Sequence, residues 1–417
     1  MFRYITAALA CAAALGIAIA GETKVSRAVT LDEAVARAVA ASPSLQARGE
    51  LAAGAEAQVR QSGVRPNPTI DAQLENFAGS GRFSDLDESE LTLGLTQRIE
   101  RAGKREGRTA VAEAERDAAT HERERTRLNV VFDARKAFID VVTAETALSN
   151  ADARLKAARE VEAMAARRVN SARDPITVKL RAEIQTSEAR AARAQAEHDL
   201  HNAKRTLTLL WGEQDRDVKV DATSLKLPVS DPKGPKAAAS PDIAVREIEA
   251  RRAAAKVELE EANSRSDVSL GFGVRRFENG GDLAGVLTFS MPLAVFDGNE
   301  GAIARAKAER RAAELDIADA TLRYETALVV LEEEAVRSRT ELDALRQEML
   351  PRAKSVLAAA RRGYGLGAFS YQEIAEAQRI LAELSAREVA AFRTLHTAYA
   401  SLERLSGAAA SVQGEEQ

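Results

Sequence analysis

Several features of enzymes and disulfide-stabilised proteins are missing from this 417-residue chain. Its only cysteine is Cys11, so a single chain cannot form a disulfide. It has no Gly-x-Ser-x-Gly, phosphate-binding loop or His-Glu-x-x-His motif, which argues against the usual hydrolase, nucleotide and metalloprotease sites. The net charge of −4 argues against nucleic-acid binding, which needs a basic surface. We therefore expect no enzyme activity, no cofactor, no bound metal and no nucleic-acid partner.

Long hydrophobic runs are also missing beyond the N-terminus, so no transmembrane helix is expected there. The start is different: residues 4–17 are apolar or small, and Ala18-Ile19-Ala20 fits a signal-peptidase site. We expect residues 1–20 to be a cleaved signal peptide, with a membrane anchor as the alternative. Lipidation of Cys11 is a further alternative, although Ala8 stands where a lipidation motif usually has leucine.

The remaining chain contains one structural unit twice. Ser42-Pro43 corresponds to Ser240-Pro241, and Gly103 corresponds to Gly298. Other matches keep an offset of about 195 residues, which indicates a tandem duplication with small insertions. A proline-rich segment between the two units reads as a linker.

Glycine and proline are scarce in long parts of each unit. Residues 108–211 contain no glycine and one proline, and residues 368–406 contain neither. These parts are rich in Ala, Glu, Arg, Leu and Gln, which favour helix. Pro351 should kink or break one of the helices. The predicted long helices span about 104–169, 177–211, 300–362 and 369–406, and the first would be a rod of roughly 100 Å.

Shorter segments alternate with a period of two, which is typical of strands with one apolar face. We predict strands at about 68–77, 90–98, 267–277 and 284–292. Tilted strands of roughly 9–11 residues cross an outer membrane, although soluble antiparallel sheets show the same alternation. On the membrane reading, the lipid-facing residues include Leu93, Leu270 and Phe289, and the water-facing residues include Thr92, Gly271 and Thr288.

The number of strands points to an assembly. In lipid an open sheet edge leaves backbone groups without hydrogen-bond partners. Closed membrane barrels start at about eight strands, so four strands need strands from other copies. We therefore predict an oligomer whose strands join into one barrel.

Three segments carry a family resemblance. Residues 96–105 (TQRIERAGKR) and 291–299 (MPLAVFDGN) resemble the strand-to-helix junctions of TolC-type outer-membrane efflux proteins, in particular those serving cobalt-zinc-cadmium resistance pumps. Residues 361–370 (RRGYGLGAFS) resemble the helix tip of that family at its periplasmic end. The resemblance extends over about residues 30–407.

The resemblance implies a fold and an assembly. The fold would be α+β and mostly α, with two tandem repeats of two transmembrane strands plus a long helical hairpin. Three copies would form a 12-stranded β-barrel on an α-helical barrel, in the outer membrane and reaching into the periplasm. The expected segments are a signal peptide at 1–20, a first repeat at 21–212, a linker at 213–239, a second repeat at 240–407 and a flexible tail at 408–417.

The resemblance also implies a function. The channel would passively conduct substrate, expected to be heavy-metal cations, from a periplasmic adaptor protein and an inner-membrane transporter of the resistance-nodulation-division (RND) type. The expected adaptor contacts lie at the helix tips. They are Asn170, Asp174, Pro175, Thr177, Gly363, Tyr364, Gly365, Leu366, Gly367 and Ser370.

Acidic residues near the tips are candidates for the narrowest part of the pore, because carboxylate rings attract cations. These candidates are Asp174, Glu183 and Glu376. His198 and His201 stand one helical turn apart, but two ligands are too few for a metal site. The alternatives are an adaptor-like coiled-coil protein, an enzyme using this histidine pair, and an outer-membrane channel that exports drugs or proteins.

Overall fold

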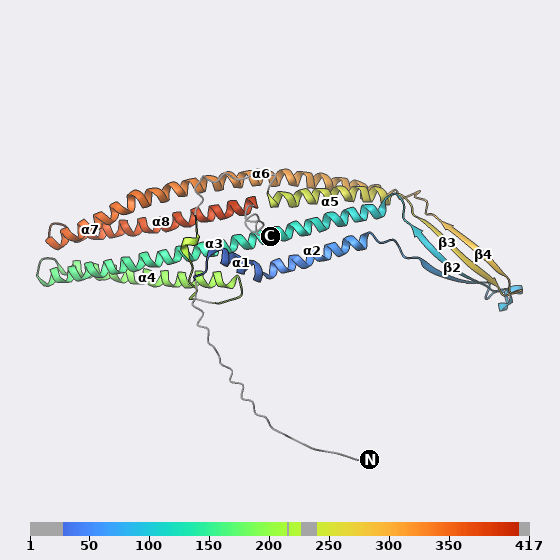
Figure 1. Cartoon of the computed structure of the whole chain (residues 1–417), viewed down its shortest axis with the longest axis horizontal. Helices are drawn as coiled ribbons and strands as arrows, with labels where there is room; N and C mark the ends of the chain where they lie inside the picture. Colours follow the sequence, from blue (N-terminus) through green and yellow to red (C-terminus); the bar gives the residue numbers. More distant parts are fainter. Residues whose placement is uncertain (1–27, 215–216, 227–239, 408–417) are drawn as a thin grey trace, which may run out of the picture.

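The computed structural model describes residues 28–214, 217–226 and 240–407, and it is an elongated rod with helices at one end and strands at the other (Figure 1). The mostly helical α+β class predicted from the sequence is confirmed. The expected signal peptide at 1–20, with Cys11, and the expected tail at 408–417 lie outside the described residues. So does most of the expected linker.

Each repeat contains two strands that lie between a short front helix and a long helical hairpin. The first repeat consists of α1 (Leu31–Ala41), α2 (Pro43–Ser62), β1 (Thr69–Glu75), β2 (Glu90–Ile99), α3 (Lys104–Asn170) and α4 (Ile176–Leu209). The second repeat consists of α5 (Pro241–Asn263), β3 (Val268–Phe277), β4 (Leu283–Ser290), α6 (Glu300–Ala344), α7 (Leu350–Leu366) and α8 (Tyr371–Ser406).

The front helices begin at residues suited to helix starts. Thr30 accepts a hydrogen bond from the Glu33 backbone N–H at 3.3 Å and so caps α1. Ser42 does the same for the Leu45 N–H at 3.3 Å, and Pro43 occupies the first position of α2, where its missing N–H costs nothing. The short kink between α1 and α2 therefore follows from Ser42-Pro43.

The four strands form one antiparallel sheet in the order β1-β2-β3-β4. The pairing of β2 with β3 joins the two repeats, with Leu93 opposite Val274. Within the described part of the chain, β1 and β4 each have one edge without a strand partner. Both hairpin loops, β1–β2 and β3–β4, lie at the end of the sheet that is remote from the helices (Figure 1).

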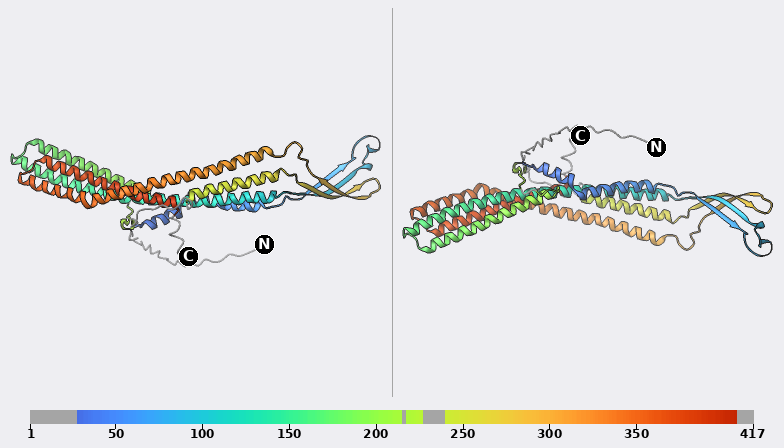
Figure 2. Two further views of the ribbon diagram at one scale, coloured as in Figure 1. Left: turned by 90° about the horizontal axis from the view of Figure 1, so that it is seen from above. Right: turned by 90° about the horizontal axis from the view of Figure 1, so that it is seen from below.

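The helices pack side by side, with α3 between α2 and α4 on one side and α5 and α8 on the other (Figure 1), and the same rod is seen from above and below in Figure 2. The apolar seam of α3 is buried: Phe138 and Val141 lie in a cluster with side chains of α1 and α4, and Val161 lies in a second cluster at the tips. At the far end, α7 and α8 pack onto α3 and α4 through a cluster that includes Ile374 and Ala165. Burial of these side chains holds the two hairpins together.

Pro351 does not break its helix. The five residues Leu345–Met349 adopt π-helical pitch between α6 and α7, and Pro351 lies in the first turn of α7. Proline cannot donate the i→i−4 hydrogen bond, and a π-bulge is one way for a helix to absorb such an interruption. The chain therefore continues as α7 in nearly the same direction.

None of the helices in the described ranges combines the length and the apolar character needed to cross a bilayer.

Candidate functional site

The sheet has one apolar face, and it is exposed. Residues directly opposite each other in an antiparallel sheet share a face. The register therefore places Ile70, Leu95, Phe272 and Leu287 in one row across all four strands. All four side chains are exposed, and Leu287 is 83% exposed. Among the described residues no helix covers this face. Exposing an apolar surface of this kind to water would cost free energy.

The other face of the sheet is polar and lined by small residues. One row contains Thr69, Thr96, Gly271 and Thr288. At Gly273 an added Cβ would lie 2.6 Å from the Leu93 carbonyl oxygen, so glycine is required there. Small side chains on one face and large ones on the other suit a sheet that curves with its polar face on the concave side.

A charged cluster occupies the loop end of the polar face. Arg275 donates to Glu90 Oε2 at 2.7 Å and to Thr92 Oγ1 at 2.9 Å, and it pairs with Glu75 Oε2 at 2.9 Å. These side chains come from β1, β2 and β3, so the cluster ties three strands together across the repeat boundary. Sequence reasoning missed it, because no local motif connects residues 185 positions apart.

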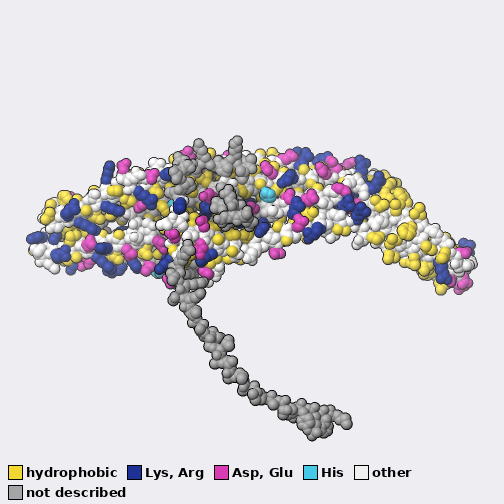
Figure 3. Space-filling view, viewed as in Figure 1, with side chains coloured by type: hydrophobic (Ala, Val, Ile, Leu, Met, Phe, Trp, Pro, Cys, Tyr) yellow, Lys and Arg dark blue, Asp and Glu magenta, His cyan; other side chains and the backbone are white. Residues whose placement is uncertain are grey.

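Figure 3 shows how the side chains are distributed over the surface. Hydrophobic side chains gather over the strands, and charged side chains gather at the hairpin loops and over the helices (Figure 3). Such an apolar band between two polar regions is the pattern of a β-sheet in a lipid bilayer.

The helix tips are locked together by Arg168, Asp174 and Tyr364. Arg168 donates two hydrogen bonds to the Asp174 carboxylate, at 2.8 and 3.0 Å. The Tyr364 hydroxyl donates to the same carboxylate at 2.6 Å, and Arg168 also donates to the Tyr364 carbonyl at 2.8 Å. We call these three residues the tip clamp. It joins the α3–α4 turn of the first repeat to α7 of the second.

The tip clamp shifts the ionisation of its members in the direction expected for a charge-assisted pair. Hydrogen bonds from Arg168 hold the pKa of Asp174 below its usual range, and those from Tyr364 act in the same direction. Burial and the bond to Asp174 raise the pKa of Tyr364 well above its ordinary value. Asp174 is therefore ionised and Tyr364 neutral at physiological pH.

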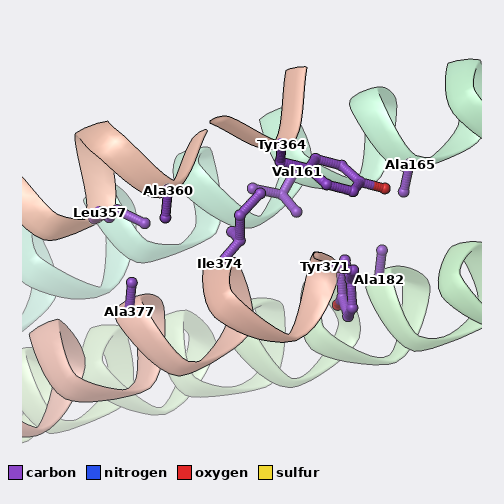
Figure 4. Packing of buried hydrophobic residues seen from close by; sticks show 9 residues of the cluster. All are labelled: Val161, Ala165, Ala182, Leu357, Ala360, Tyr364, Tyr371, Ile374 and Ala377. Atoms are coloured by element: carbon purple, nitrogen blue, oxygen red, sulfur yellow. The ribbon is translucent and has the colours of Figure 1, made fainter. Parts of the chain in front are cut away.

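The residues expected to contact an adaptor take different positions. Tyr364 is 1% exposed and packs among Val161, Ala165 and Tyr371, so it supports the tip from inside (Figure 4). Leu366 is 87% exposed. The remaining members, apart from Asp174 and the partly exposed Gly363, are exposed: they are Asn170, Pro175, Thr177, Gly365, Gly367 and Ser370.

The glycines of the second tip have three different roles. Gly367 has φ +85° and ends α7 in the left-handed conformation that glycine favours. Gly365, by contrast, lies inside α7 and is not among the residues with positive φ. Gly363 makes room for Phe369, whose Cδ2 would lie 2.3 Å from an added Cβ.

The three acidic candidates for the constriction all have cationic partners within the chain. Asp174 belongs to the tip clamp, Glu183 lies 3.7 Å from Lys179, and Glu376 lies 2.7 Å from Arg379. Asp174 is nearly enclosed, whereas Glu376 is exposed. The geometry therefore gives Asp174 a structural role at the tip.

His198 and His201 are both exposed on α4. In the described part of the chain no group of three or more His, Cys, Asp or Glu side chains is arranged to hold a metal ion.

We expect Asp174→Asn to loosen the helix tips. A hydrogen bond to a charged group contributes about 1.5–3 kcal/mol, so amide exchange at the tips should become about ten- to a hundredfold faster at pH 7. Asp152→Asn is the control, because Asp152 forms an exposed pair with Arg193 that contributes little. Hydrogen-exchange mass spectrometry measures both variants, and equal rates in the wild type and Asp174→Asn would contradict the clamp.

Wild type and Asp174→Asn also test the direction of the pKa shift of Asp174. A carboxylate with a lowered folded-state pKa stabilises above its unfolded pKa, about 3.9, and loses that contribution as the pH falls through the folded value. The difference between wild type and Asp174→Asn in the free energy of opening the tips should therefore become smaller below about pH 4. A difference that persists at lower pH would mean that the carboxylate charge does not matter.

Comparison with known proteins agrees with this geometry. The sequence profile of the outer membrane efflux protein family matches residues 34–213 and 236–408. The cobalt-zinc-cadmium resistance protein CzcC of Cupriavidus metallidurans is 24% identical over 384 residues, covering 91% of this chain and 90% of CzcC. The nickel-cobalt-cadmium resistance protein NccC of Alcaligenes xylosoxydans xylosoxydans is 28% identical over 273 residues, covering 64% of this chain and 60% of NccC.

Solved structures show the same fold. The outer membrane protein VceC of Vibrio cholerae superposes with a TM-score of 0.75 at 19% identity, covering 90% of this chain and 96% of VceC. The family profile covers both repeats, including the strands and the helical hairpins. The chain therefore belongs to the outer membrane efflux protein family.

Proposed function

We propose that three copies of this protein form a passive conduit that crosses the outer membrane and extends through the periplasm. The observation that carries the proposal is the sheet, which has an exposed apolar face, a polar face and two unpaired edges. Pairing β4 of one copy with β1 of the next in three copies closes a barrel of twelve strands. Its apolar face would meet lipid and its polar face would line the pore.

An exposed seam on α6 supports association along the helices as well. Leu315, Leu322, Val329 and Val336 recur every seven residues and are between 42% and 69% exposed. A strict seven-residue apolar repeat is the pattern of a helix that packs against another helix. In the described part of the chain α6 packs on α5, α8 and the π-helical segment. The seam therefore suits a helix from a second copy.

The opposite edge of the helical layer also exposes apolar side chains. The helices α2 and α4 pack mainly on α3, one after the other along its length. Near the tip, Ile176, Leu180 and Ile184 form an exposed apolar stripe on α4. Different surfaces at the two edges produce head-to-tail association, which closes into a ring when the rotation allows it.

Transport would take its energy from elsewhere. The proposed partners are an RND-type inner-membrane transporter and a periplasmic adaptor, and the adaptor would dock on the tips around Leu366. This side chain is exposed, and it belongs to the last residue of α7, directly before the capping residue Gly367. An exposed leucine on a rigid helix end can enter a groove on a partner protein.

Leu366→Asp should abolish resistance in cells while leaving the protein assembled in the outer membrane. The substitution removes an apolar contact and adds a charge that the adaptor surface would have to desolvate. Leu86→Asp is the matched control, because Leu86 is an exposed leucine in the β1–β2 loop at the other end of the molecule. If Leu366→Asp still exports normally and still crosslinks to the adaptor, the docking site lies elsewhere.

The tip end would also contain the narrowest part of the closed conduit. We propose Glu183 and Glu376 as the cation-attracting carboxylates there, with Asp174 holding the tip in shape. Glu183→Gln with Glu376→Gln should weaken block of single channels by divalent cations in planar bilayers, since carboxylate rings attract cations. Unchanged block by divalent cations in this double variant would mean that Glu183 and Glu376 are ordinary surface carboxylates and do not line the constriction.

The proposed substrates are divalent heavy-metal cations, because the names of both curated relatives refer to resistance to such metals. The test is deletion of the gene followed by growth with cobalt, zinc, cadmium, nickel, copper and hydrophobic drugs. Sensitivity to one or more metals that is reversed by the wild-type gene would support the proposal. Sensitivity to drugs alone would favour the alternative of an organic substrate.

A further inference from the structure

Each repeat joins its second strand to its long helix through a short junction, and the two junctions differ in chemistry. We call residues 100–103 the first junction and residues 291–299 the second junction. Each is followed by a long helix whose capping residue has a left-handed backbone, Gly103 with φ +77° and Asn299 with φ +60°. The two junctions are thus equivalent parts of the duplicated unit.

The first junction is fixed by an ionic cluster around Asp267. Lys104 Nζ donates to Asp267 Oδ1 at 2.8 Å, and Arg98 Nε donates to Asp267 Oδ2 at 2.8 Å. The Arg101 backbone N–H also donates to Oδ1, at 3.3 Å. Asp267 directly precedes β3, so this cluster attaches the first junction to the turn between α5 and β3.

Within the described ranges the second junction has no comparable ionic cluster. Its inner side is held by Asn299, which donates to the Glu260 carbonyl of α5 at 2.8 Å. Leu293, Val295 and Phe296 are exposed, and Phe296 is completely so. Three large apolar side chains therefore project at the point where the unpaired edge of β4 meets α6.

The first repeat has its own counterpart of the α5–β3 turn, and this counterpart lies at the opposite edge of the chain. It comprises residues 63–68 between α2 and β1, and it exposes Val64 and Pro68. Gln97 steadies this turn by donating to the Pro66 carbonyl at 2.9 Å. The turn therefore places the apolar side chains of Val64 and Pro68 next to the unpaired edge of β1.

We propose that the second junction of one copy packs on the α2–β1 turn of the next copy, as an apolar counterpart of the Asp267 cluster. The proposal rests on the trimer proposed above. Within the chain, β2 pairs with β3 and the first junction binds the following turn. Repeating that step once more pairs β4 with β1 of a second copy and brings the second junction to its α2–β1 turn.

The chemistry of the equivalent positions explains why this contact is apolar. The residue directly before β1 is Pro68, which takes the place of Asp267. The first residue of α6 is Glu300, which takes the place of Lys104. The ionic cluster cannot form between copies, whereas Leu293, Val295 and Phe296 can bury their surface against Val64 and Pro68.

The test is a crosslink between Phe296→Cys and Val64→Cys. Cys11 is the only native cysteine, so Cys11→Ser provides a background without other thiols. A short bis-maleimide applied to outer membranes should convert the double variant into covalent dimers and trimers on a denaturing gel. Each single variant should stay monomeric on that gel, and so should Phe296→Cys with Leu51→Cys, because Leu51 lies on the middle of α2.

Native mass spectrometry of the same samples separates the ways in which the proposal can fail. If trimers are present but no crosslink forms, and Phe296→Cys reacts only with a lipid-soluble maleimide, then the second junction faces lipid and the proposal is overturned. If trimers are absent, the proposed assembly itself fails and the contact between copies falls with it.

Discussion

Leu287→Arg should deplete the protein from the outer membrane, whereas Thr288→Arg should assemble at wild-type levels. These neighbours in β4 point to opposite faces of the sheet, and Leu287 lies in the row across the middle of the strands. Arginine on the lipid face near the membrane midplane costs about 2–4 kcal/mol in each of three copies. Thr288 lies on the polar face, where arginine can remain in water. Quantitative blots of outer-membrane fractions measure the effect.

The choice of control follows from the hydrogen bonds of the sheet. Thr92 also lies on the polar face, but it accepts a hydrogen bond from Arg275 at 2.9 Å. Thr92→Arg would therefore place two guanidinium groups together, and Thr288→Arg avoids this. Leu93→Arg should behave as Leu287→Arg does. Equal assembly of the Leu287→Arg and Thr288→Arg variants would mean that the strands do not form a transmembrane barrel.

Leu322→Asp should dissociate the trimer while leaving each chain folded. Leu322 is 64% exposed in the single chain, so the substitution removes little internal contact, whereas at an interface it removes about 1.5–3 kcal/mol of burial per copy. In the trimer the substitution would also bury the charge of the new aspartate. We expect at least a tenfold loss of detergent-resistant trimer, measured by native mass spectrometry, with unchanged helix content by circular dichroism.

Arg323→Asp is the matched control for this variant. It introduces the same side chain one residue further along α6, at an exposed position whose ion pair, with Asp319 at 2.8 Å, lies on the same helix. Such pairs contribute little, so the trimer should persist. If Leu322→Asp leaves the trimer intact, then the exposed seam of α6 is not buried between copies.

The sheet was readable from the sequence because its signal is local. The alternation of Leu91, Leu93 and Leu95 with threonine and glycine fixes which face of β2 is apolar before any partner is known. The register then carries the same face through Phe272 and Leu287. The family could be recognised for a related reason, since its junctions and tips are short, contiguous segments.

The tip clamp and the Asp267 cluster could not be found in this way. Asp174 and Tyr364 are 190 residues apart, and only the docking of the two hairpins brings them together. The sequence therefore could not show that Asp174, a candidate pore residue, bonds to both Arg168 and Tyr364. Similarly, nothing local distinguishes Gly365 inside α7 from Gly367 at its end. These features depend on tertiary packing, which propensity and spacing do not encode.

The central claim is that three copies line one pore, and thiol block of single channels tests it most directly. Channels of the Thr288→Cys variant, made in the Cys11→Ser background, would be recorded in planar bilayers during addition of a bulky, water-soluble methanethiosulfonate. We predict three equal downward steps in conductance, one for each copy, because Thr288 lies on the polar face of the sheet. The Leu287→Cys channel should show none. Absence of a channel, or block of Leu287→Cys rather than Thr288→Cys, would contradict the account.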